Sequence, residues 1–376
     1  MERTDAWGAA AAMLVALPSA IAFGVAMYAP LGPGFAGAGA LAGIIGTAAL
    51  GILAPALGGA PRVVSAPCAP AAAVMAALCA ELLAGGSSPE RIAVTMALVG
   101  LCAGALQVLF GALGGGRLIK YIPYPVVTGY MTGVGLMIIL KQTGPFFGFP
   151  KAAGAAGLLS PSSWQWPSFF VASVTAAATI AGPRLTKRLP AAIVGLGAGI
   201  AAHAAAGLFR PGLLSLDSNP FIIGAVSTDP GAVLSGVASN IRALGLLGFR
   251  DIPGVLVPAL TLSVLLSIDT LKTCVVADSL VRSRHDSDRE LRGQGAGNMV
   301  SAALCGMPGA GTLGATMVSI ASGGKTRFAG ILEGAFALAA ALALGGAIGR
   351  IPLAALAGLL TVVGARMIDR GSLRLA

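Results

Sequence analysis

Charged residues are scarce in this sequence. Asp, Glu, Lys and Arg make up 10% of its 376 residues, against about 25% in a soluble domain. Aromatic residues contribute 5% and His occurs only twice, whereas 56% of the residues are hydrophobic. A soluble fold could not bury so much apolar surface away from water, which excludes a soluble globular protein. The shortage of polar residues also excludes disorder, although Gly and Pro are abundant. We predict a polytopic membrane protein.

Catalytic and redox patterns are absent as well. The five cysteines form no CxxC pair, and we interpret them as small buried hydrophobes. The apolar segments contain neither a nucleophile–base pair nor a His/Glu metal motif. We therefore expect no enzyme. The first apolar segment is long and has no clear small-residue cleavage site, so we expect no cleavable signal peptide.

Twelve apolar segments of helical length follow one another along the chain. They comprise 6–28, 35–53, 69–83, 91–113, 125–140, 168–182, 190–208, 255–281, 293–305, 312–322, 328–348 and 352–368. A polar stretch rich in Pro and Gly separates the first seven from the last five. We predict an all-α protein with a first repeat at 1–208, an extracellular connector at 209–254 and a second repeat at 255–376.

The distribution of positive charge sets the orientation. If the N-terminus is cytoplasmic, 16 Lys and Arg residues lie on the cytoplasmic side and 7 on the other, with Lys272 inside a segment. Cytoplasmic loops are enriched in Lys and Arg. The net charge of +10 therefore indicates membrane orientation and no nucleic-acid partner. We expect an integral protein of a bacterial inner membrane.

Two of the segments are too short to cross a bilayer. Segments 69–83 and 312–322 would span about 16–23 Å as helices, against a hydrocarbon core of about 30 Å. Each follows a Pro- and Gly-rich run that predicts extended backbone, 65–70 and 306–311. Both are third in their half of the chain, which is the pattern of a transporter with inverted repeats. We expect two half-helices whose N-termini meet near the membrane midplane.

Such a meeting point has the chemistry of an anion site. Unpaired N–H groups and the positive ends of two helix dipoles would face one point. The residues around it are small, which lets an oxyanion approach the main chain. Small residues are also common where membrane helices pack, so the pattern alone leaves both interpretations open.

Asp269 is the carboxylate that lies near the middle of a long apolar segment, 255–281. A charge at that depth costs roughly 2.5–3.5 kcal/mol on insertion scales. With Thr273 it could ligate Na⁺, it could carry a proton, or it could pair with Lys272 as a structural ion pair. Lys272 could also take the place of a coupling cation. Glu333, by contrast, is expected to extend toward the cytoplasmic boundary.

Five motifs resemble the membrane domain of the sulfate permease (SulP) family of inorganic anion transporters. They are LPSAIAFGVA at 17–26, SAPCAPAAAV at 65–74, YIPYPVVTGYMTG at 121–133, the 45-residue run from SIDTLKTC to GMPGAG at 267–311, and IPLAALAGLLTVVGARMID at 351–369. The long run is similar to the sodium-dependent bicarbonate transporter subgroup. The resemblance implies seven-plus-seven inverted repeats, a core domain moving against a gate domain, and a homodimer.

The resemblance also implies site residues. A substrate site would comprise Pro67, Cys68, Ala69, Gly311 and Thr312. A sodium site would comprise Asp269, Thr273 and Gly311, with Thr312 as a further candidate. Sodium would then be the coupling ion, and no other cofactor is implied.

Three departures from the family pattern bear on these expectations. Lys272 replaces an apolar residue and Leu313 replaces a hydroxyl ligand, and both weaken the case for sodium coupling. The sequence given has five segments in its second repeat and no STAS domain. We expect secondary active transport of bicarbonate or sulfate, coupled to Na⁺ or H⁺. The alternatives are an uncoupled anion conductor or exchanger, and a nucleobase permease of the same fold.

Overall fold

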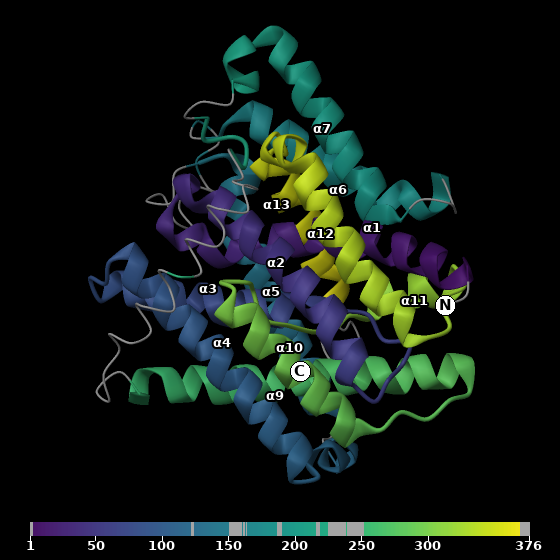
Figure 1. The fold of residues 1–376 in the computed structure, drawn as a ribbon. Helices are drawn as coiled ribbons and strands as arrows, with labels where there is room; N and C mark the ends of the chain where they lie inside the picture. Colours follow the sequence, from purple (N-terminus) through teal and green to yellow (C-terminus); the bar gives the residue numbers. More distant parts are fainter. Residues whose placement is uncertain are drawn as a thin grey trace. The chain divides into compact units, whose positions relative to one another are not determined.

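The computed structural model describes residues 3–121, 124–149, 164–185, 190–215, 219–224 and 252–368, with single residues at 160, 162 and 238. Its described part contains an α-helix at each of the twelve predicted apolar segments (Figure 1). These are α1 (Arg3–Tyr28), α2 (Ala36–Leu57), α3 (Ala69–Ala84), α4 (Pro89–Ala112), α5 (Tyr124–Phe147), α6 (Trp166–Leu185), α7 (Ala191–Phe209), α9 (Ile252–Val281), α10 (Ser287–Ala303), α11 (Leu313–Ala321), α12 (Arg327–Gly349) and α13 (Leu353–Met367).

Short 3₁₀ turns and two short strands complete the described elements. The turns are η1 (Ala29–Leu31), η2 (Pro33–Phe35), η3 (Gly115–Tyr121) and η6 (Pro211–Leu214). The strands, β1 (Ser65–Pro67) and β2 (Gly309–Gly311), lie within the two runs for which extended backbone was predicted, and they pair with each other. The predicted connector, 209–254, lies mostly outside the described residues.

Helix α10 begins six residues before the predicted segment. Asp286 caps its N-terminus by accepting a hydrogen bond from the backbone N–H of Arg289 at 3.0 Å. Asp288 and Glu290 then place negative charge in the first turn, where the helix dipole favours it. Because this turn is polar, the search for apolar segments could not detect it.

The chain forms two compact units, and neither corresponds to one predicted repeat. Unit 1 combines Met1–Ile122 with Ser227–Leu344, and unit 2 combines Pro123–Val226 with Gly345–Ala376. Each unit therefore takes helices from both halves of the chain. The repeat boundaries at 1–208 and 255–376 stay a prediction.

Unit 1 is held by close helix contacts at small residues. Helix α4 packs along α10 and crosses α9 (Figure 1). At the α4–α10 contact, a Cβ on Gly104 would lie 2.7 Å from the carbonyl oxygen of Gly295, and one on Gly295 would lie 2.5 Å from that of Gly104. Only residues without a side chain permit such an approach of two membrane helices.

Unit 2 packs α6 against α7, and α13 against α5 and α6. A short bridge joins the start of α13 to the segment after α7. The N–H of Leu353 donates to the carbonyl oxygen of Phe221 at 2.8 Å, and the N–H of Ile223 donates to that of Ile351 at 3.0 Å. These bonds join the segment after α7 to the N-terminus of α13 within unit 2.

Six helices of the described part are long and apolar enough to cross a membrane. They are the spans Thr4–Leu31, Pro33–Leu57, Pro89–Ala112, Ala191–Phe209, Gly254–Val281 and Arg327–Gly349. A span of roughly 20 predominantly apolar residues matches the thickness of a bilayer core. The chain is an integral membrane protein with an all-α fold.

We expect Asp5→Ala to destabilise unit 1. The Asp5 side chain is fully buried, and its oxygens accept from the N–H groups of Lys325 and Thr326 at 2.8 and 3.1 Å and from the Thr326 hydroxyl at 2.7 Å. Loss of these bonds leaves buried donors unsatisfied, at a cost of about 1–3 kcal/mol. The melting temperature in detergent should fall. Glu81→Ala, at an exposed position, is the control, and an equal melting temperature for both variants would contradict this account.

Candidate functional site

The two half-helices begin at opposite ends of one antiparallel ribbon. Ser65 pairs with Gly311, and Pro67 pairs with Gly309. Because β1 continues into α3 and β2 into α11, antiparallel pairing makes the helices leave the ribbon in opposite directions. Three residues of strand are about 7 Å long from first to last Cα. The N-termini of α3 and α11 are thus held on either side of a very short element.

Neither half-helix has a side-chain cap. Cys68 and Thr312 occupy the N-cap positions in extended conformation, and neither side chain accepts a hydrogen bond from its own helix. The Thr312 hydroxyl donates instead to the carbonyl oxygen of Val64 at 3.2 Å. First-turn N–H groups that side chains leave uncapped, together with the positive ends of two dipoles, favour an anion.

Helix α9 holds β2 through two buried threonines. The Thr270 hydroxyl accepts from the N–H of Gly311 at 3.0 Å, and the Thr273 hydroxyl donates to its carbonyl oxygen at 2.8 Å. Both threonines have no exposed surface. They satisfy the two backbone groups of Gly311, so the position of β2 is tied to the middle of α9.

Helices α4 and α10 hold the other end of β2. The Asn298 amide donates to the carbonyl oxygen of Gly309 at 3.0 Å and accepts from its N–H at 2.8 Å. The same amide donates to Gln107 of α4 at 2.7 Å. Gln294, one turn earlier on α10, donates to the Ser65 hydroxyl of β1. Buried side-chain amides of α10 therefore bond to both strands of the ribbon.

Asp269 and Lys272 form an ion pair on α9. The Lys272 ammonium lies 2.6 Å from Asp269 Oδ1, and their side chains are 33% and 14% exposed. The pair joins residues i and i+3 of one helix, as the sequence allowed. It follows that one carboxylate oxygen of the predicted sodium site already has a positive partner.

The structure brings most of the predicted site residues together in unit 1. Pro67, Cys68 and Ala69 form the junction of β1 with α3, and Gly311 and Thr312 form that of β2 with α11. All of these except Thr312 are buried. Thr273 contacts Gly311 directly. Of the predicted sodium ligands, Thr273 and Gly311 are bonded to each other, while Asp269 pairs with Lys272.

We did not predict from the sequence that the buried polar side chains of α10 belong to the site. Gln294, Asn298 and Ser301 are all fully buried, and Ser301 donates to the carbonyl oxygen of Met307 at 2.9 Å. Their spacing of four and three residues places them on one helix face. A polar stripe of this kind inside an apolar segment was the signal that could have identified them. Asn298 also links α10 to α4 through its bond to Gln107.

Glu333 does not extend to the membrane boundary. Its side chain has no exposed surface, and neither carboxyl oxygen has a hydrogen-bond partner among the described residues. The expectation was wrong because the position of a residue along a helix indicates its depth in the membrane but not the direction of its side chain. That direction depends on the neighbouring helices.

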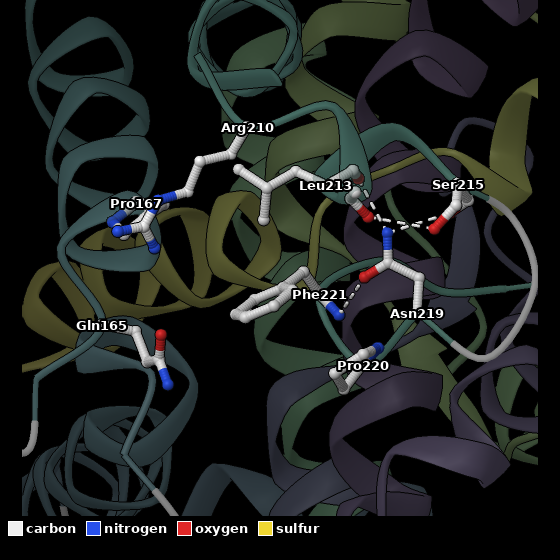
Figure 2. A pocket seen from close by; sticks show the side chains of 9 residues that line it. Gln165, Pro167, Arg210, Leu213, Ser215, Asn219, Pro220 and Phe221 are labelled. Carbon is white, nitrogen blue, oxygen red and sulfur yellow. Dashed lines mark hydrogen bonds between the residues drawn. The ribbon is translucent and has the colours of Figure 1, made fainter. Parts of the chain in front are cut away.

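A separate cavity of about 340 Å³ lies in unit 2 (Figure 2). Asn219 forms part of its wall and is fully engaged. It donates to the carbonyl oxygens of Leu213 and Ser215 at 2.7 and 2.9 Å, and it accepts from the N–H of Phe221 at 3.0 Å. None of the predicted site residues lines this cavity. The Asn219 amide is thus used in shaping the loop.

Comparison with known proteins agrees with this architecture. The model of the sulfate permease family matches residues 3–376. The chain belongs to the sulfate permease family. Within it, the chain is 33% identical to the bicarbonate transporter BicA of Picosynechococcus sp. over 100% of its own length and 63% of that protein. It is 25% identical to the putative sulfate transporter YvdB of Bacillus subtilis, over 73% of this chain and 50% of that one.

Two solved structures share the fold. The transmembrane domain of a cyanobacterium bicarbonate transporter BicA superposes with a TM-score of 0.80 at 32% identity, covering 99% of this chain and 90% of that one. Murine Slc26a9 in the inward-facing state gives a TM-score of 0.77 at 16% identity, covering 97% and 60%. The fold is thus the inverted-repeat transporter type with two half-helices. The chain spans 63% and 58% of the lengths of two BicA proteins.

We expect Gly309→Ala to disrupt the ribbon. A Cβ at this position would lie 2.2 Å from the carbonyl oxygen of Ala66, which is backbone and cannot move aside without breaking the strand pair. Overpacking of this kind costs about 1–3 kcal/mol. Thermal unfolding in detergent should begin at a lower temperature. Gly254→Ala, where no atom lies within 4 Å of the added Cβ, should unfold like the wild type. Equal stability of the two variants would contradict the proposed close packing.

Proposed function

We propose that this protein carries a small inorganic anion, bicarbonate or sulfate, across the membrane by alternating access. The anion would bind at the N-termini of α3 and α11, beside Pro67, Cys68, Ala69, Gly311 and Thr312. One observation carries the proposal: the β1–β2 ribbon holds two side-chain-uncapped helix N-termini on either side of three residues. A site built from backbone N–H groups suits an oxyanion and requires no Arg.

The relatives support this class of substrate. BicA of Picosynechococcus sp. is named a bicarbonate transporter, and YvdB of Bacillus subtilis a putative sulfate transporter. Both anions are small and present several oxygens to hydrogen-bond donors. A nucleobase permease would need side chains that read a heterocyclic edge, and the backbone-built site offers few. The family and the named relatives are transporters, which favours transport over catalysis.

The proposal includes two alternatives for the cation that accompanies Asp269. In the first, Na⁺ binds Asp269, Thr273 and Gly311 and favours the entry of the anion. In the second, Lys272 is the built-in counter-cation, so that transport needs no sodium and is either uncoupled, as in an anion conductor or exchanger, or coupled to H⁺. The 2.6 Å pair between Lys272 and Asp269 favours the second, because Na⁺ would have to displace an ammonium group from the carboxylate.

The cellular setting is also proposed. We infer a homodimer in a bacterial plasma membrane with a cytoplasmic N-terminus, as the loop charges and the family resemblance indicate. Unit 1, which contains every proposed binding residue, would be the moving core. Unit 2 would be the gate.

Purified protein in liposomes should take up labelled bicarbonate or sulfate, and Asp269→Asn should slow that uptake about tenfold. The substitution removes a charge-assisted hydrogen bond worth about 1.5–3 kcal/mol, and 1.4 kcal/mol corresponds to a factor of ten. Glu90→Gln, at an exposed position, should retain wild-type uptake. Wild-type uptake by Asp269→Asn, with and without a sodium gradient, would rule out a role for Asp269.

Lys272→Leu should convert uptake from sodium-independent to sodium-dependent. Removal of the ammonium frees the Asp269 carboxylate, which then needs a cation from solution. Uptake is measured in sodium and in choline buffers, and the ratio should rise from near one to about ten. Lys272→Arg retains the positive charge and should keep the ratio near one. A wild type that already requires sodium, or a Leu variant indifferent to it, would overturn the counter-cation role.

A further inference from the structure

Glu333 is a buried acid without a partner in a membrane-spanning helix. It lies in α12 within the span Arg327–Gly349. Its side chain is 0% exposed, and both carboxyl oxygens lack a hydrogen-bond partner in the described part of the protein. Ionisable groups at such a depth are costly and commonly mark ion or proton pathways.

Two other buried acids of unit 1 have hydrogen-bond donors at their carboxyl oxygens. Asp5 accepts three hydrogen bonds from Lys325 and Thr326. Glu290 Oε2 accepts from the N–H groups of Gly59 and Ala60, both at 2.9 Å, and its Oε1 accepts from Gln294 at 3.2 Å. Glu333 has none of these donors. Burial alone is therefore not what distinguishes it, since the other two are equally enclosed.

A glycine lies beside the Glu333 carboxyl group. A Cβ on Gly51 of α2 would lie 2.5 Å from Glu333 Oε2, so this glycine makes room for the carboxyl group. Gly334 packs against the same turn of α2, at the carbonyl oxygen of Ala48. Helix α2 has no titratable residue, and the other charged residue of α12 is Arg327, whose guanidinium donates to the carbonyl oxygen of Ala56 at 3.3 Å.

Three charged residues on the other helices packed against α2 are engaged elsewhere. Helices α1 and α10 both pack on α2. Asp5 of α1 and Glu290 of α10 hold the backbone donors described above. Arg289 of α10 donates to the carbonyl oxygen of Leu57 at 3.1 Å. None of these groups bonds to the Glu333 carboxyl in the described part of the protein.

A proton is the ligand that this setting accepts. An unpaired carboxylate in an apolar interior costs several kcal/mol, whereas a bound proton removes its charge. A metal cation would need further oxygen or nitrogen ligands, and no cluster of three or more His, Cys, Asp and Glu residues occurs in the described part of the chain. The neutral acid is thus the form in which Glu333 rests.

Helix α12 is also the helix that passes from one compact unit to the other. Unit 1 ends at Leu344 and unit 2 resumes at Gly345, inside α12. Glu333 lies eleven residues before this point, in the unit 1 part of the helix. Glu333 therefore lies on a helix that contributes residues to both units.

We propose that Glu333 is a proton-binding site that loads and unloads one proton in each transport cycle. A carboxylate oxygen forms an O–H bond with a proton from water on one side and returns that proton to water on the other. The bound proton offsets the charge that the anion brings into unit 1, so both move in the same direction. This inference rests on the proposed anion transport and adds its driving ion.

The first test measures protonation without transport. Infrared difference spectra of the purified protein across a pH series should show the C=O stretch of a protonated carboxylic acid that persists to neutral pH. Glu333→Gln should remove this band, and Glu90→Gln should retain it. A spectrum in which the Glu333 band is that of a carboxylate at neutral pH would overturn the proposal, whatever the transport assays give.

The second test measures coupling in proteoliposomes. A proton gradient of one pH unit, acidic outside, should raise the accumulation ratio of labelled sulfate about tenfold in the wild type, as one proton per anion requires. Glu333→Gln, which mimics the neutral acid in shape, should remove the dependence while its melting temperature stays that of the wild type. Uptake that is present but indifferent to pH in both proteins would overturn the proton site alone. No uptake of either anion by the wild type would overturn the transport function itself.

Discussion

The hydrogen bonding of six non-helical residues is the constraint on which the site depends. In a bilayer every backbone polar group must find a partner inside the protein. Strands β1 and β2 meet this requirement by pairing with each other and with buried side chains from α9 and α10. Where these strands lie, α3 and α11 must begin. The position of two helix N-termini therefore follows from the satisfaction of six residues.

The acids of unit 1 show how differently one charge can be accommodated. Asp5 and Glu290 are stabilised by backbone N–H groups and join distant parts of the chain. Asp269 is neutralised by an ammonium group three residues away. Glu333 has neither kind of support. An uncompensated charge is costly inside a membrane protein. The first three acids have fixed partners in the protein, whereas for Glu333 we propose a proton as the ligand.

Much of the architecture could be predicted because an apolar segment is recognised from residues that are adjacent in the sequence. All twelve apolar segments are helices, and the short length and Pro- and Gly-rich approach of two of them identified the half-helices. Asp269 and Lys272 are neighbours on one helix turn, so their pair was foreseeable. The start of α10 and the burial of Glu333 were missed, because a polar first turn leaves no apolar signal and because the neighbour that makes room for Glu333 is a glycine 282 positions earlier.

The sequence by itself determined the membrane setting, the segment pattern and the residue types at the half-helix junctions, since these depend on composition and on spacing along one helix. Only the tertiary structure decided which strand pairs with which, that Thr270, Thr273 and Asn298 satisfy β2, and that Glu333 faces Gly51. These contacts join residues far apart in the chain. Hydrogen bonds and close packing in three dimensions select such partners, and no local periodicity records them.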